Sequence, residues 1–162
     1  MESITIETQD AENRRIDNFS AGDRAIYLSI SFISSIMLVT GRLLTPSSKG
    51  VGTHQQLGFP PCLFLHFTGV PCPNCGLTTS FAHAARLSFK SALLTQPFGL
   101  TVFALAVISL PLSAYLSFRK ISWKRIIYAT PADRFIYSLM VFYIICWIYK
   151  ILTMKFYSAA NN

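Results

Sequence analysis

Three long apolar stretches constrain this chain more than any other feature of its sequence. They read AIYLSISFISSIMLVTGRLL at 25–44, FGLTVFALAVISLPLSAYLSF at 98–118 and RFIYSLMVFYIICWIYKILTM at 134–154. A helix needs about 20 predominantly apolar residues to cross a bilayer, and each stretch has that length. Charged residues make up only 13% of the sequence, well below the share of about 25% in soluble domains. The sequence therefore predicts an all-α integral membrane protein with three transmembrane helices.

A polar segment precedes the first span. Residues 1–20 contain few apolar side chains, so we expect a disordered N-terminal tail followed by a single membrane domain over 21–162. The tail holds five acidic residues and lacks the short basic start of a signal peptide, and no small-residue cleavage site closes the first span. We therefore interpret residues 25–44 as a retained anchor.

Lysine and arginine between the second and third spans predict the orientation. Short loops rich in these residues tend to stay cytoplasmic. The loop contributes Arg119, Lys120, Lys124, Arg125 and Arg134. Three crossings then place the N-terminus in the cytoplasm and the 45–97 connection outside, and we expect a multi-pass membrane protein.

The remaining charges fit the same environment. Arg42 and Lys150 lie near the ends of their spans, where long side chains are expected to reach the lipid headgroups. The net charge is +7, but the basic residues form no stripe and accompany no nucleic-acid motif. We expect lipid, and no nucleic acid, among the partners.

The external connection contains two apolar segments that are too short to cross. One is CLFLHFTGV at 62–70, and the other is TSFAHAARLSFKSALL at 79–94. The second has a helical period, with Phe81 and Phe89 on one face and His83 and Lys90 on the other. It predicts one amphipathic interfacial helix, ended by Gln96-Pro97.

A Cys-x-x-Cys motif lies between these segments, in GVPCPNCGLTTSF at 69–81. Proline restricts the backbone and glycine permits conformations that other residues avoid, so the surroundings predict a stiff turn that holds Cys72 and Cys75 in place. Threonine side chains just after the turn are suited to capping a following helix. The expected structural residues of this Cys-rich turn are Gly69, Pro71, Pro73, Gly76 and Thr78.

Three chemistries are open at this motif. A redox pair would use Cys72 and Cys75 as attacking and resolving thiols, in either order. A zinc or iron site would use Cys62, Cys72 and Cys75, with His83 as the favoured fourth ligand and His66 or His54 as alternatives. In a purely structural turn the thiols pack or form a fixed disulfide.

No hydrolytic site is predicted. Asp133 is the last acidic residue and the only one after Asp23, so paired carboxylates are excluded there, and no phosphate loop or nucleophile motif occurs. We expect a non-enzymatic accessory, assembly or ligand-binding subunit that works through an outer-face Cys-x-x-Cys loop, together with a membrane-protein partner or a second copy. The alternatives are a membrane thiol-disulfide oxidoreductase and a zinc- or iron-binding membrane protein.

The motif resembles that of the bacterial membrane-protein family known as domain of unknown function 2752. Members are similar in having Cys, about nine residues, Cys-Pro-x-Cys-Gly-x-Thr-Arg, an interfacial helix and an Asn-Pro-like turn. Thr79 stands where the family usually has Arg. The resemblance implies a protein of the bacterial cytoplasmic (inner) membrane and brings no established activity. The matching positions are Cys62, Thr68, Gly69, Cys72, Pro73, Cys75, Gly76, Leu77, Thr78 and Gln96-Pro97.

Overall fold

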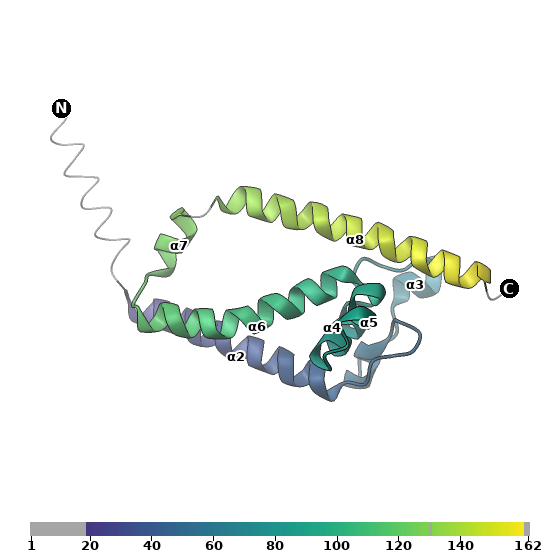
Figure 1. Cartoon of the computed structure of the whole chain (residues 1–162), viewed down its shortest axis with the longest axis horizontal. Helices are drawn as coiled ribbons and strands as arrows, with labels where there is room; N and C mark the ends of the chain where they lie inside the picture. Colours follow the sequence, from purple (N-terminus) through teal and green to yellow (C-terminus); the bar gives the residue numbers. More distant parts are fainter. Residues whose placement is uncertain (1–18, 130, 161–162) are drawn as a thin grey trace, which may run out of the picture.

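The computed structural model describes residues 19–129 and 131–160, which are helices and connecting loops with no strand (Figure 1). Three helices contain stretches long and apolar enough to cross a membrane, Ala21–Leu43, Pro97–Phe118 and Asp133–Lys155. The three predicted spans are therefore confirmed, and the architecture is that of a multi-pass membrane protein. The predicted disordered tail lies, apart from its last two residues, outside the described part of the chain.

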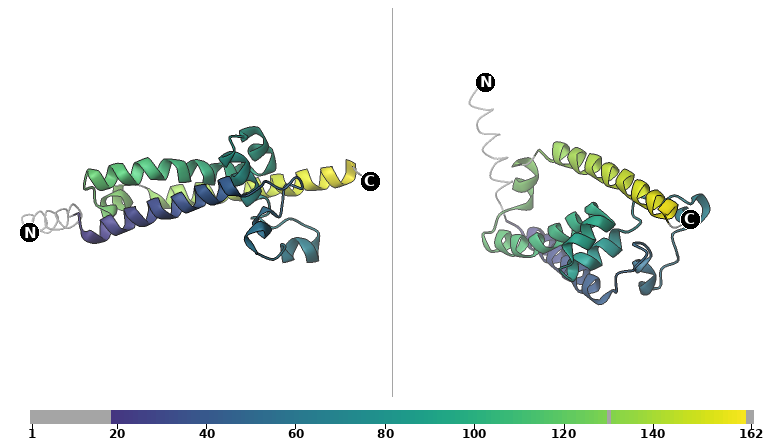
Figure 2. Two further views of the ribbon diagram at one scale, coloured as in Figure 1. Left: turned by 90° about the horizontal axis from the view of Figure 1, so that it is seen from below. Right: turned by 45° about the vertical axis from the view of Figure 1, so that its right-hand side comes forward.

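The first two spans, α2 (Ala21–Leu43) and α6 (Pro97–Phe118), pack side by side (Figures 1 and 2). Serine hydroxyls join them, Ser31 to Ser113 at 2.6 Å and Ser34 to Ser109 at 2.7 Å. Lipid tails are as apolar as leucine, so small residues and interhelical hydrogen bonds rather than hydrophobicity hold such a pair together.

The N-terminus of α2 is capped and tied to the chain that follows α6. Ser20 and Asp23 form a capping box, which satisfies backbone N–H groups that have no intrahelical partner. The same Asp23 carboxylate accepts the backbone N–H of Trp123 at 3.1 Å, at the start of α7 (Trp123–Ala129). The Tyr27 hydroxyl donates to the Ile121 carbonyl at 3.0 Å. Asp23 and Tyr27 are both buried.

Residues 44–96, here called the cap, cover the opposite end of the α2–α6 pair (Figure 1). The cap contains a 3₁₀ turn η1 (Thr53–Leu57) and the short helices α3 (Leu63–Thr68), α4 (Leu77–Ala85) and α5 (Phe89–Thr95). Glycines permit the close crossings of α4 with both spans. A Cβ on Gly41 would lie 2.5 Å from the Phe81 ring, and one on Gly99 would lie 2.8 Å from the Leu77 carbonyl.

The predicted single amphipathic helix over 79–94 is wrong, because the structure divides it into α4 and α5. Arg86 ends α4, Leu87 takes a left-handed conformation with φ 61°, and the Ser88 N–H bonds back to the His83 carbonyl. The buried Ser80 hydroxyl bonds to the carbonyls of Ala92 and Gln96 at 2.8 and 2.7 Å, which requires α5 to fold back beside α4. Periodicity describes one face of a helix and contains no record of this long-range bond.

The third span lies in α8 (Ala132–Ala160), which runs apart from α2 and α6 over much of its length (Figures 1 and 2). It meets α6 where Phe98 contacts Phe142 and Tyr143, with ring centroids 6.2 and 4.9 Å apart. Four of its side chains bond to residues of the cap, those of Tyr143, Trp147, Tyr149 and Lys150. The third span is therefore positioned by the segment that contains the cysteine motif.

Candidate metal centre

Three thiols converge in the cap. Cys62 precedes α3, and Cys72 and Cys75 lie in the turn before α4, yet their Sγ atoms are all within 4.8 Å of one another. Gly69 allows this meeting, because it ends α3 in a left-handed conformation with φ 67° and reverses the chain toward Cys72. We call these three residues the thiol cluster.

The turn at 71–76, the motif turn, is built by its own backbone. The Cys75 N–H donates to the Cys72 carbonyl at 2.9 Å, and the Leu77 N–H donates to the Asn74 carbonyl at 3.1 Å. The two thiols of the turn thereby point to the same place, with their Sγ atoms 3.2 Å apart. Pro71 is buried and Pro73 half-buried, and the predicted Cys-rich turn is present.

Gly76 ends the turn at a position that no other residue fits. Its φ is 91°, and an added Cβ would lie 2.9 Å from the Gly50 carbonyl oxygen and 3.0 Å from the Lys150 Nζ. Gly76 is also the N-cap of α4, with no side-chain cap. The predicted capping by threonines is therefore wrong: Thr78 lies half-buried in the first turn, and the Thr79 hydroxyl bonds instead to Thr53 at 2.8 Å.

Side chains of α8 hold the motif turn from the other side. The Trp147 indole N–H donates to the Pro71 carbonyl at 2.9 Å, and the Tyr143 hydroxyl donates to the Asn74 side-chain oxygen at 2.9 Å. From the start of α6, the Gln96 side-chain amide donates to the Pro73 carbonyl at 2.8 Å. Partners that orient a ligand-bearing loop in this way strongly affect metal affinity.

Lys150 does not reach the lipid headgroups as predicted. It is only 5% exposed, and its ammonium donates to the carbonyls of Gly50 at 3.2 Å and Thr95 at 3.1 Å. The ammonium lies beside Gly76, which directly follows Cys75 in the chain. A charge inside an apolar span is costly to bury, and this one is retained next to the thiol cluster.

The thiols differ in their environments. Backbone N–H groups of α3, first that of Leu65, lower the pKa of Cys62 below its usual value, as expected for a thiol at a helix N-terminus. Burial raises the pKa of Cys75 well above its usual value. Without a cation to bind, Cys75 is therefore held as a neutral thiol, whereas Cys62 is the more readily ionised of these two.

A cleft of about 440 Å³ opens beside the thiol cluster. Cys62 and Cys75 line it together with His54, His66 and Lys49. His83 belongs neither to this lining nor to the group of close ligand atoms formed by the three cysteines. It is half-buried in α4, where burial and the nearby Arg86 lower its pKa. The structure therefore brings three of the four predicted metal ligands together and leaves out His83.

Sulfur positions of this kind suit a tetrahedral cation. Two sulfurs that are each 2.3 Å from a tetrahedral zinc lie about 3.8 Å apart. The Cys72–Cys75 separation of 3.2 Å and the outer limit of 4.8 Å within the thiol cluster bracket that distance. Changing these separations by at most about 1 Å would place the three sulfurs around a common ion.

Sequence reasoning missed the roles of Lys150, Tyr143 and Trp147. The sequence did signal Lys150, because a cation within an apolar span points to an intramembrane partner. Nothing signalled the two aromatic residues, since tyrosine and tryptophan near a span end are usual at membrane interfaces.

Taken together, the fold and the site define a multi-pass helical membrane protein with a cysteine cluster between its spans. Residues 62–110 match the family model described as "Protein of unknown function (DUF2752)". The match covers Cys62, the motif turn, α4, α5 and the first part of α6, and it confirms the family resemblance over these residues. No curated protein and no solved structure matches the chain.

Proposed function

We propose that this chain is a membrane-anchored metal-binding subunit whose thiol cluster binds zinc. The observation that supports the proposal best is the convergence of Cys62 with Cys72 and Cys75. A redox pair needs only Cys72 and Cys75. A purely structural turn does not need either of them to lie near Cys62. Three cysteines within bonding reach of one ion are the donor set of a zinc site.

The charge balance of the site supports the same cation. Three thiols that bind Zn²⁺ release three protons, and the resulting tris-thiolate complex has a charge of −1. The buried ammonium of Lys150 lies beside Gly76 and provides the compensating charge. A buried ion is tolerated when it is paired with an opposite charge and its hydrogen bonds are satisfied. Here the carbonyls of Gly50 and Thr95 accept hydrogen bonds from the Lys150 ammonium.

The cleft supports a role in binding rather than a purely structural one. Closed structural zinc sites have four protein ligands, whereas sites that exchange a ligand keep one position open. Here a cleft opens beside the thiol cluster, where His54 or His66 or an external ligand would complete the coordination. We propose a non-enzymatic role, that of an accessory or assembly subunit that takes up or presents the metal.

The test is metal analysis of the full chain purified in detergent. We expect one zinc per chain, lost in Cys62→Ser, Cys72→Ser and Cys75→Ser and retained in Cys146→Ser, whose thiol is buried in α8 away from the cluster. Double substitution of His54 and His66 by alanine then identifies the fourth ligand. Zinc-free wild-type protein, or retention of zinc by Cys62→Ser, would contradict the proposal.

A thiol-disulfide oxidoreductase is the second candidate, favoured by the 3.2 Å approach of the Cys72 and Cys75 sulfurs. Cys62→Ser separates the two functions, because redox chemistry at the pair does not need Cys62. Differential alkylation in cells should find a mixture of reduced and oxidised Cys72–Cys75 in a redox protein. In a metal protein the cysteines should be reduced, and a chelator should make them accessible to the alkylating reagent.

We further propose that the thiol cluster faces outward in a bacterial cytoplasmic membrane, with the N-terminus inside. The support is the basic loop after α6, because such loops tend to stay cytoplasmic. A membrane-impermeant maleimide should then label Cys62 in intact cells when it is the sole cysteine. Labelling only after the cells are opened would indicate the opposite orientation, with Cys62 on the cytoplasmic side.

A partner subunit or a second copy is also part of the proposal. Large apolar side chains remain exposed on α2 and α8, among them Phe32 at 68% and Tyr137 at 73%. Crosslinking in native membranes, followed by gel analysis of the full chain, will show whether protein as well as lipid covers these faces.

A further inference from the structure

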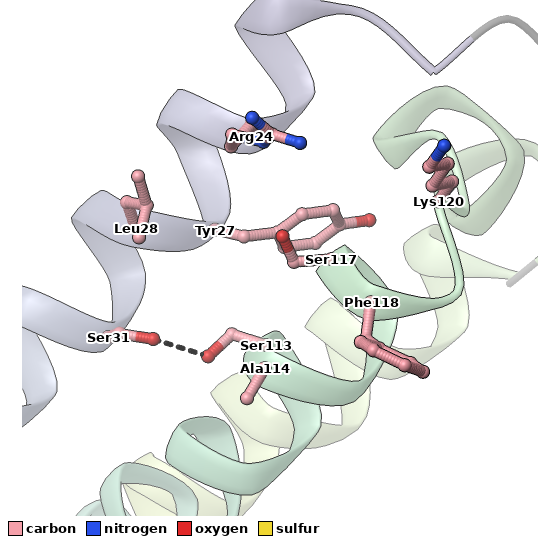
Figure 3. Close-up of a pocket in the computed structure, with 9 residues that line it drawn as sticks. All are labelled: Arg24, Tyr27, Leu28, Ser31, Ser113, Ala114, Ser117, Phe118 and Lys120. Carbon is pink, nitrogen blue, oxygen red and sulfur yellow. Dashed lines mark hydrogen bonds between the residues drawn. The ribbon is translucent and has the colours of Figure 1, made fainter.

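A second site lies at the other end of the α2–α6 pair, away from the thiol cluster. An open cavity of about 570 Å³ is lined by both helices there, beside the turn that leads into α7 (Figure 3). Arg24 of α2 and Lys120 after α6 line it from its two sides, and serine hydroxyls line its deeper part. The cysteine chemistry makes no use of this cavity.

Both cations at the cavity mouth are exposed and unneutralised. Neither the Arg24 guanidinium nor the Lys120 ammonium makes a hydrogen bond or ion pair with the residues that the structure describes. The nearest acid in sequence, Asp23, is buried and directs its carboxylate to Ser20, Ser122 and the Trp123 N–H. Two positive charges thus face the cavity without a counter-ion from residues 19–129 or 131–160.

Lys120 is held in a conformation that disfavours a side chain. Its φ is 54°, and the bonds from Lys120 N–H to Ser117 and from Ile121 N–H to Leu116 form the usual C-terminal turn of a helix. Glycine is the common residue at this position, and any other adds about 1–2 kcal/mol of strain. The chain places a long cation there instead.

Apart from the cations, Tyr27 and the serines, the lining of the cavity is apolar and open to the surroundings of the helices. Leu28 is 62% exposed and Phe118 is 87% exposed, and both line the cavity with Ala114. Ser31 lies seven residues beyond Arg24, about 10 Å further along the helix. The cavity therefore has a cationic mouth at the end of the spans and an apolar wall along them.

We propose that this cavity binds the headgroup of an anionic phospholipid. Its phosphate would lie between Arg24 and Lys120, its glycerol region would meet the Ser117 hydroxyl, and an acyl chain would follow Leu28 and Phe118. Basic pockets between membrane helices recognise anionic headgroups by this combination of charge and apolar surface. A free phosphate would satisfy the two cations but would leave the apolar wall uncovered, so the geometry favours a lipid.

Lipid titration of the full chain in detergent tests the proposal. Dioleoyl-phosphatidylglycerol in mixed micelles should bind and raise the thermal midpoint, whereas dioleoyl-phosphatidylcholine and inorganic phosphate should not. Each cation near an anionic surface changes affinity about fivefold, so Arg24→Gln with Lys120→Gln should weaken binding about thirtyfold. The matched control is Arg119→Gln, which removes one neighbouring charge that does not line the cavity, and it should bind like the wild type.

Each contrary result overturns the proposal in a distinct way. Equal binding of the two lipids would show that the cavity does not recognise the lipid charge. Binding of inorganic phosphate alone would assign the site to a soluble anion. If the double variant bound phosphatidylglycerol as tightly as the wild type, or Arg119→Gln lost as much affinity as the double variant, the lipid would be attracted to the basic loop as a whole and not to this cavity. All of the variants change exposed side chains, and their thermal midpoints without lipid verify that they fold.

Discussion

At the scale of single residues, two glycines around the motif have the same backbone conformation and different surroundings. Gly69 and Gly76 both have positive φ, but only Gly76 lies against other atoms, the Gly50 carbonyl and the Lys150 ammonium. The glycine that follows Cys75 therefore serves close packing as well as chain reversal. The pair allows the two effects to be measured separately.

We expect Gly69→Ala to lower the free energy of unfolding by about 1 kcal/mol, the strain of a left-handed alanine. Gly76→Ala should lower it by about 3 kcal/mol, because overpacking adds a further 1–3 kcal/mol. Thermal unfolding of the full chain in detergent with a chelator present measures both. Equal losses in the two variants would mean that the Lys150 contact moves aside without strain.

His83 makes stability depend on pH. Burial and Arg86 lower its pKa in the folded chain below the ordinary value of 6.5, so the unfolded chain binds a proton first as the pH falls. This contribution to stability is complete above about pH 6.5 and is lost as the pH falls through the folded pKa. His83→Gln should flatten the pH dependence of the thermal midpoint below pH 6.5, and an unchanged profile would assign that dependence to other groups.

At the scale of elements, glycine determines how closely α4 crosses the spans. Gly99 of α6 lies against Ser80 and the Leu77 carbonyl, and Gly41 of α2 lies against Phe81. The helix that follows the motif turn is thereby held between both spans. These crossings therefore determine where the thiol cluster lies relative to the spans.

Gly99→Ala should lower the free energy of unfolding by about 1–3 kcal/mol, because its Cβ would lie 2.7 Å from the Ser80 Cβ and 2.8 Å from a carbonyl. The control is Gly22→Ala in α2, where the nearest atom is at 3.4 Å and alanine is the better helix former. It should be neutral or slightly stabilising. Similar destabilisation by the two substitutions would show that α4 does not pack as tightly as described.

At the scale of the whole molecule, the third span and the thiol cluster depend on each other. The chain has two packed spans, a cap over one end, and α8 attached chiefly through bonds to that cap (Figure 2). A movement of α8 would therefore act on the motif turn as well as on the contact with α6. This coupling gives the proposed metal site a direct link to anything that binds α8.

Trp147→Phe tests that coupling. It removes the N–H donor to the Pro71 carbonyl and keeps an aromatic ring in α8, and we expect zinc affinity to fall about tenfold, as for other partners that orient metal ligands. Competition with a chromophoric chelator measures the affinity. The control is Trp123→Phe, whose ring packs on Tyr27 at the far end of the molecule, and a tenfold loss there as well would indicate general destabilisation.

The sequence by itself determined the three spans, the position of the motif turn and the family to which residues 62–110 are matched. Hydropathy is a sum over neighbouring residues, and the backbone preferences of proline and glycine are local. Both the spans and the turn can therefore be predicted from a single sequence. Only the tertiary structure decided that Cys62 joins Cys72 and Cys75 while His83 does not, that α4 and α5 are separate, and that Lys150 turns inward. Each of these depends on contacts between residues distant in the chain, and the rotation of a helix about its axis, which sets those contacts, comes from packing against its neighbours rather than from its own pattern.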